Sequence, residues 1–108
     1  MIEGTIKSKE DFNRIFNKGK RRTGKYLTLI IDGGEKRNRI GVVVSGKYGG
    51  AVLRNKVKRQ IKEAYRALGR EIKGILDMIV IPRQQAKKAK TGELIEDIRE
   101  ILSRMQAL

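Results

Sequence analysis

The densest group of chemically active side chains lies between residues 54 and 66. Six of these thirteen residues are Lys or Arg, and only Glu63 is acidic. Neighbouring cations repel one another on a helix, and charged faces that are merely solvated usually mix the two signs. The segment therefore favours binding of a polyanion, with a solvated charged face as the alternative. The candidate nucleic-acid-binding residues are Arg54, Asn55, Lys56, Lys58, Arg59, Lys62 and Arg66.

A helix must hold these side chains on one side of the molecule. Apolar residues recur at intervals of three or four along the segment, at Leu53, Val57, Ile61, Ala64 and Leu68. This period predicts an amphipathic helix over residues 52–68, ending near Gly69. Arg54, Lys58 and Lys62 are four residues apart, so they stack along one edge of it. The amide of Asn55 could read a base edge or a sugar hydroxyl, or it could simply face water.

Two aromatic residues form a second candidate site. Phe12 and Phe16 are the only phenylalanines, and they lie one turn apart in a predicted helix over residues 9–17. Ser8 supplies an N-cap for this helix, and Gly19 follows its end. The two rings either belong to the core or form a stacking platform for unpaired bases.

The residues needed for ordinary protein catalysis are missing. The chain has no cysteine and no histidine. Disulfides, thiolate zinc sites and cysteine nucleophiles are therefore excluded, and the usual general base and metal ligand are absent. Four acids, Glu10, Asp11, Asp32 and Asp77, are scattered in the sequence and predict neither a carboxylate pair nor a metal site. We expect no catalytic side chain and no metal bound by the protein.

Length and charge narrow the class of protein further. The 108 residues carry 26 basic and 12 acidic side chains, a net charge of +14. We expect one domain, residues 1–108, with a small core. The apolar runs are too short to span a bilayer, and the N-terminus has no signal-peptide core, which favours the cytoplasm. The partner most consistent with this charge is a polyanion.

The remaining pattern predicts how the helix over residues 52–68 is positioned. Residues 26–32 and 39–45 read as the two arms of a β-hairpin, and residues 77–81 as a buried strand. Glycines at 46, 49 and 50 fit a loop from strand to helix. A last helix carries apolar residues from 94 to 105, with Thr91 as its N-cap. Strand, helix and strand between residues 39 and 81 form a βαβ unit.

Residues 41–63, GVVVSGKYGGAVLRNKVKRQIKE, resemble the signature of the bacterial ribonuclease P protein component. That pattern runs roughly Ser-Lys-Lys, Gly-Asn-Ala-Val, Arg-Asn-Arg, Lys-Arg and Arg-Glu. The chain departs from it at Gly46, Gly50, Lys56 and Lys62, of which the two lysines keep the charge but lose the planar fork of arginine. The resemblance places Leu29 on the cleft face, where some relatives carry an aromatic residue, and a leucine there weakens a stacking role. The resemblance covers nearly the whole chain, including Phe12 and Phe16.

The resemblance implies an α/β fold, an α+β two-layer sandwich in the order αβββαβα with a left-handed βαβ crossover. It implies the protein subunit of an endoribonuclease that removes the 5′ leader of precursor tRNA, with the RNA subunit as the catalyst. Mg²⁺ would be held by that RNA, and the protein would be a monomer in the ribonucleoprotein. The implied leader-binding cleft contains Phe12, Phe16 and Lys47. The ridge over residues 54–62 would lie near the catalytic RNA and the leader, with Arg54 and Asn55 closest to the substrate.

Two other classes of protein stay open on the residues alone. A ribosomal or RNA-chaperone protein would bind RNA without stimulating leader cleavage. A DNA-binding architectural protein would prefer duplex DNA to single-stranded RNA.

Overall fold

The computed structural model describes residues 4–107. Its elements follow the chain as β1 (Gly4–Thr5), α1 (Lys9–Lys18), β2 (Lys20–Thr23), β3 (Leu27–Gly33), β4 (Arg39–Val42), the 3₁₀ helix η1 (Gly46–Tyr48), α2 (Ala51–Leu68), β5 (Leu76–Pro82), the 3₁₀ helix η2 (Gln84–Lys88) and α3 (Thr91–Arg104). The order αβββαβα is confirmed, with the two-residue β1 added before it.

The strands form one five-stranded mixed sheet in the order β1-β4-β5-β3-β2. The predicted hairpin between β3 and β4 is wrong, because β5 lies between them, antiparallel to β3 and parallel to β4. The apolar run of β5 is buried on both faces, so a central position with a neighbour on each side suits it better than an edge. The β3–β4 loop crosses the start of β5, where the Asn38 side-chain oxygen accepts a hydrogen bond from the Leu76 N–H at 2.8 Å.

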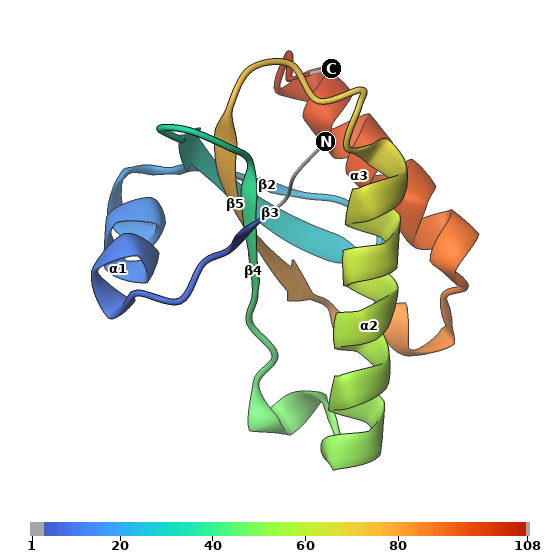
Figure 1. Ribbon diagram of the computed structural model, residues 1–108. Coiled ribbons are helices and arrows are strands. Elements are labelled where there is room, and N and C mark those ends of the chain that lie inside the picture. The colour runs from blue at the N-terminus through green and yellow to red at the C-terminus, as the bar shows by residue number, and fades with distance from the viewer. Residues whose placement is uncertain (1–3, 108) are drawn as a thin grey trace.

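The alternation of side chains along the strands gives the sheet two apolar faces. Leu29 and Val80 belong to the large cluster under α2 and α3. Ile30 and Ile79 point the other way and pack with Ile15 of α1. Figure 1 shows the result, with α1 on one side of the sheet and α2 and α3 on the other. We call the side that carries α1 the α1 face. The placement of Leu29 on the cleft face with Phe12 and Phe16 is wrong, because the alternation along β3 turns its side chain toward α2 and α3.

The β4–α2–β5 connection joins two parallel neighbours through a helix. In Figure 1, β4 descends toward η1, α2 climbs back, and β5 lies behind β4, which is the left-handed sense. Nearly all such crossovers are right-handed. The left hand implied by the family resemblance is thus present, and local patterning alone would have favoured the opposite one.

The helix ends follow local chemistry, with one correction. Ser8 caps α1, its hydroxyl accepting from the Glu10 N–H at 3.1 Å. Thr91 was expected to cap the last helix but is the first residue of α3, whose N-cap is Lys90. The Glu93 carboxylate reaches back and accepts a hydrogen bond from the Lys90 N–H at 3.0 Å, so an acid at N3 rather than a hydroxyl supports this helix start.

A buried carboxylate connects the last helix to the sheet. Asp97 of α3 accepts hydrogen bonds from three consecutive backbone N–H groups, those of Lys25, Tyr26 and Leu27, each at 2.9 Å. Gly24 lies so close that a Cβ there would sit 2.6 Å from an Asp97 oxygen. The turn between β2 and β3 is therefore held in place by α3.

In the described part of the chain, no helix has the length and hydropathy needed to cross a membrane.

Candidate nucleic-acid interface

Helix α2 separates its apolar and cationic residues as the sequence predicts. Its buried residues are Val57, Ile61, Ala64, Tyr65 and Leu68. Arg54, Lys58 and Lys62 are partly exposed along the border of that stripe, and Asn55, Lys56, Arg59 and Arg66 are exposed. The helix is therefore attached to the core on one side and presents cations on another. We give the name α2 ridge to these seven polar and basic residues: Arg54, Asn55, Lys56, Lys58, Arg59, Lys62 and Arg66.

The edge of α2 beyond the apolar stripe is occupied by the protein itself. The Gln60 side-chain nitrogen donates to the Ala89 carbonyl at 3.3 Å, next to η2. Helix α3 packs along α2 on the side of the large cluster. The cations that border the stripe at four-residue spacing lie on the opposite edge from Gln60, so most of the α2 ridge stays open to a partner.

The loop before α2 places Arg54 at the start of the helix. Gly49 adopts φ +156°, and a Cβ there would lie 2.8 Å from Leu53 Cδ1, so a residue with a side chain would be strained. The Arg54 guanidinium folds back and donates to the Gly49 carbonyl at 3.0 Å. A guanidinium has five N–H donors, so most of them stay available for a phosphate.

Phe12 and Phe16 lie together on the α1 face but have different surroundings. Their ring centroids are 6.5 Å apart with an interplanar angle of 26°. Phe12 is partly buried over the sheet, where a Cβ on Gly41 would come within 2.8 Å of its ring. Phe16 is 38% exposed. The sequence left open whether the rings belong to the core or form a stacking platform. In the structure Phe12 packs on the sheet, and Phe16 has a free ring surface.

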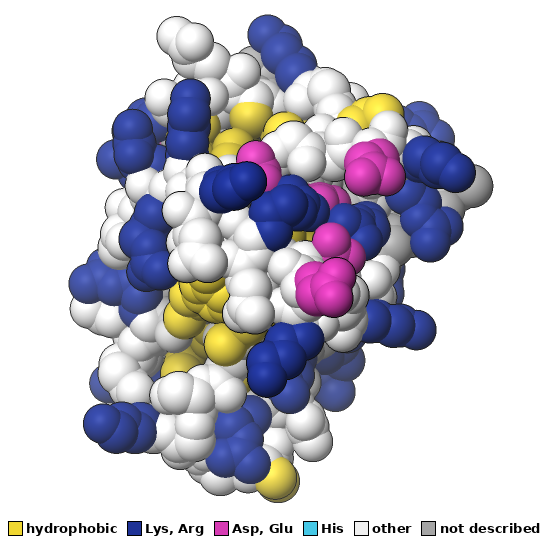
Figure 2. All heavy atoms as spheres, turned by 90° about the vertical axis from the view of Figure 1, so that its left-hand side faces the viewer, with side chains coloured by type: hydrophobic (Ala, Val, Ile, Leu, Met, Phe, Trp, Pro, Cys, Tyr) yellow, Lys and Arg dark blue, Asp and Glu magenta, His cyan; other side chains and the backbone are white. Residues whose placement is uncertain are grey.

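Figure 2 looks directly onto this face. It shows apolar side chains exposed in a hollow, with Lys and Arg side chains around it. Lys47, the third residue assigned to the cleft, is exposed in η1, beyond the end of β4. Its carbonyl accepts from the Gln84 side chain at 3.3 Å. The structure therefore joins the two phenylalanines and leaves Lys47 in a separate element.

The sequence analysis missed a partly buried cluster of ion pairs, in which Asp77 is the buried member. Asp32 and Asp77 are register partners on β3 and β5, and both point to the α1 face. Arg14 of α1 donates to both carboxylates at 2.6 Å. Arg39 of β4 donates to Asp77 at 2.7 Å and to Asp11 of α1 at 3.0 Å. Three of the four acids that were considered scattered thus meet, and Glu10 does not join them. We call this cluster the α1 clamp: Asp11, Arg14, Asp32, Arg39 and Asp77.

The protonation of the α1 clamp follows from its geometry. Burial alone would raise the pKa of Asp77, but hydrogen bonds from Arg39 and Arg14 outweigh it, so the pKa lies below its ordinary value of 3.8. The same bonds raise the pKa of both arginines. Asp77 is therefore an ionised structural group. Within residues 4–107 there is no cluster of three or more His, Cys, Asp or Glu residues suited to a metal ion.

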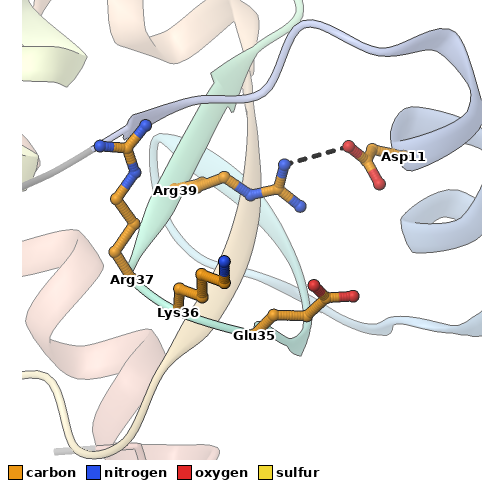
Figure 3. A pocket seen from close by; sticks show the side chains of 5 residues that line it. All are labelled: Asp11, Glu35, Lys36, Arg37 and Arg39. Atoms are coloured by element: carbon orange, nitrogen blue, oxygen red, sulfur yellow. Dashed lines mark hydrogen bonds and ion pairs between the residues drawn. The ribbon is translucent and has the colours of Figure 1, made fainter.

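Beside the α1 clamp is a pocket of about 290 Å³. Figure 3 shows its lining and the Asp11–Arg39 contact, which joins α1 to the sheet across it. The residues around it are Asp11, Glu35, Lys36, Arg37 and Arg39. Acidic and basic side chains both surround the pocket, so its lining favours neither an anionic nor a cationic ligand.

Comparison with known proteins gives a consistent result. The family model described as Ribonuclease P matches residues 3–106. The ribonuclease P protein component of Pseudanabaena sp. (strain PCC 6903) is 35% identical, over 98% of this chain and 94% of that protein. The component from Clostridioides difficile (strain 630) is also 35% identical, over 92% and 89%.

Solved structures show the same likeness in three dimensions. The RNase P protein of Staphylococcus aureus superposes with a TM-score of 0.84 at 33% identity, covering 95% of each chain. The RNase P protein of Thermotoga maritima gives a TM-score of 0.82 at 30% identity, over 93% of this chain and 96% of that one.

Proposed function

The chain belongs to the ribonuclease P protein family, and on that premise we propose which of its surfaces hold RNA. It is the protein subunit of ribonuclease P. This endoribonuclease removes the 5′ leader of precursor tRNA by hydrolysing one phosphodiester bond. It binds the RNA subunit, which is the catalyst, and assists removal of the leader.

The catalytic RNA, with the adjoining substrate, binds the α2 ridge in this proposal. The observation that carries it is the one-sided charge of α2: apolar residues attach the helix to the core, and the cations at its other edge have few acids beside them. Phosphate contacts by Lys and Arg position an RNA without reading its sequence. Arg54 and Asn55, at the start of the helix, lie closest to the cleavage site.

The single-stranded leader binds the α1 face, over Phe12 and Phe16, with Lys47 at the end of the path. The exposed ring of Phe16 supports this assignment, since bases stack on such rings without regard to sequence. Phe12 supports Phe16 from the sheet side, as their ring contact indicates.

The metal is Mg²⁺ in our proposal, and the RNA subunit holds it. The acids that meet in the α1 clamp are already paired with Arg14 and Arg39, which supports a ligand set outside the protein. We further propose that residues 1–108 form one domain, which acts as a monomer in the ribonucleoprotein and in the cytoplasm. Both apolar clusters are built on one sheet, which supports the single domain.

A cleavage assay tests the proposed function. The RNA subunit is incubated with precursor tRNA at low Mg²⁺, with and without the chain, and with polylysine as a control for charge alone. We expect the chain to restore cleavage well beyond the effect of polylysine. RNA binding without stimulation would instead favour an RNA chaperone, and preference for duplex DNA would favour an architectural protein.

A further inference from the structure

Strand β2 carries a basic run that the proposed surfaces do not use. Its four residues, Lys20, Arg21, Arg22 and Thr23, are all exposed, and β2 is the strand at one edge of the sheet. Charged residues on an edge strand discourage pairing with other chains, which alone could explain them. The register, however, gives the two arginines different surroundings.

Arg21 points to the α1 face, and Arg22 points to the other. The partner of Arg21 across the β2–β3 ladder is Ile30, which packs with Ile15 of α1. The partner of Arg22 is Leu29, which belongs to the cluster under α2 and α3. Paired residues in a sheet project to the same side, so only Arg21 borders the surface assigned to the leader.

The place of β2 brings Arg21 close to the end of α1. Only Gly19 separates α1 from β2, and a Cβ there would lie 2.7 Å from Ile30. Strand β2 therefore starts directly beside the last turn of α1, the turn that carries Phe16. Among residues 4–107, no acidic side chain pairs with Arg21.

Two hydroxyls lie next to this cation on the same face. Thr23 and Thr28 are register partners, and their Oγ1 atoms are 3.1 Å apart. Each hydroxyl keeps hydrogen-bonding capacity beyond that mutual contact. A cation with adjacent hydroxyls at the border of an apolar hollow suits a sugar-phosphate backbone, whose charge and 2′-hydroxyls it can bind.

We propose that Arg21, with the hydroxyls of Thr23 and Thr28, is a second contact point for the 5′ leader. It binds nucleotides farther from the cleavage site than those over Phe12 and Phe16. This inference rests on the proposed function, because it extends the leader path across the sheet from α1 to β2. The occupant is single-stranded RNA, chosen because the cation and hydroxyls continue the aromatic surface along the same face.

The test compares Arg21→Gln with Arg22→Gln in the assembled ribonucleoprotein. Both changes remove one charge from the same exposed strand, and only the face differs. Affinity is measured for precursor tRNA with a leader of about ten nucleotides and with one cut to about two. We expect Arg21→Gln to weaken binding of the long leader by about threefold to fivefold, the worth of an exposed charge contact. The slope of log K against log salt should fall by about 0.7 for that substrate.

The controls separate this inference from the proposed function. Arg22→Gln should leave the affinity for both substrates unchanged. Arg21→Gln should leave the affinity for the short-leader substrate unchanged. Thr23→Val keeps the side-chain shape and the strand propensity but removes the hydroxyl. It should weaken binding of the long-leader substrate only. If Phe16→Ala weakens leader binding but Arg21→Gln does not, the second contact point is wrong and the proposed function stands. Equal losses of affinity from Arg21→Gln and Arg22→Gln would also overturn it. They would indicate a general effect of net charge that does not depend on the face to which the side chain points. If Phe16→Ala has no effect on any leader, the assigned leader surface itself is wrong.

Discussion

At the scale of single residues, Phe12 and Phe16 show how one helical spacing can serve two purposes. Both rings lie on the same side of α1, yet Phe12 fills the space above Gly41, and Phe16 leaves its ring open. Substitution of each should therefore change a different property of the molecule.

We predict that Phe16→Ala weakens binding of leader-bearing precursor by about 1–3 kcal/mol, the worth of one stacked base. Binding of mature tRNA should stay the same, because it has no leader. Phe12→Ala should chiefly lower the free energy of unfolding. Equilibrium binding of both RNAs, with urea unfolding of each variant, checks this. If Phe16→Ala lowers the melting temperature and leaves leader affinity intact, both rings are ordinary core.

Asp77 shows the opposite case, a buried charge used for position. It is 1% exposed, and its partners Arg14 and Arg39 come from α1 and β4. Arg14 and Arg39 would each keep a second carboxylate partner, Asp32 and Asp11, but both would lose their charged hydrogen bonds to Asp77. Asp77→Asn should therefore lower the free energy of unfolding by about 2–3 kcal/mol. Urea unfolding measures it, with the exposed Glu100→Gln as the control.

The same residue predicts a pH dependence. Because its pKa is lower in the folded state than in the unfolded one, Asp77 stabilises the fold fully above its ordinary value of 3.8. That stabilisation is lost as the pH falls through this value toward the folded-state pKa. The difference in stability between the wild type and Asp77→Asn should thus shrink below about pH 4. A difference independent of pH would show that the loss comes from packing instead.

At the scale of elements, α2 combines attachment and recognition in one helix. The buried stripe fixes its orientation, so the spacing of the cations becomes a spacing of contacts. Each phosphate contact contributes about 0.7–0.9 to the slope of log K against log salt. The slope therefore counts the side chains that touch RNA.

Neutralising Lys58 and Arg59 together should flatten this slope by roughly 1.5 for binding to the RNA subunit. The matched control is Lys73→Gln with Arg104→Gln, which removes two exposed charges near the far end of α2. The control should lower the slope much less. An unchanged slope for a folded Lys58→Gln, Arg59→Gln variant would remove both residues from the interface.

Helix α3 positions the sheet edge through Asp97. Its carboxylate satisfies three backbone N–H groups in the turn that starts β3. Asp97→Ala should lower the free energy of unfolding by about 3 kcal/mol, since several polar groups would lose their partner. Hydrogen exchange should speed up first at the amides of residues 25–27. Asp97→Asn, which keeps one acceptor oxygen, should lose less; equal losses in both variants would contradict the hydrogen-bond explanation.

At the scale of the whole molecule, the chain has a net charge of +14 and contains no histidine or cysteine. Such a chain can reduce repulsion between two RNAs, and it lacks the usual side chains for proton transfer or nucleophilic attack. The acids that come together in the fold are held by arginines.

We therefore predict that the chain alone cleaves no precursor tRNA at any Mg²⁺ concentration. The RNA subunit alone should be active at high Mg²⁺, and the chain should lower the concentration required. Gel analysis of cleavage products with highly purified components checks both statements. Cleavage by the protein alone that disappears on substitution of Asp32 or Asp77 would indicate a protein nuclease instead.

The sequence by itself determined the features that depend on local period and composition. The apolar stripe of α2 fixes which cations face outward, because a helix repeats every 3.6 residues. The apolar, β-branched run before Pro82 fixes a buried strand, and the net charge fixes the class of partner. Ser8 as the cap of α1 follows from one hydroxyl next to the first free amides.

Only the tertiary structure decided which strands are neighbours and which distant side chains meet. Local pattern predicted a β3–β4 hairpin, but burying both faces of β5 places it between them. That insertion makes Asp32 and Asp77 register partners and lets Arg14, 63 residues before Asp77, reach both. The register of β2 against β3 sets the face on which Arg21 projects. Such contacts depend on long-range pairing, whose register is set by the whole core, and no local period encodes it.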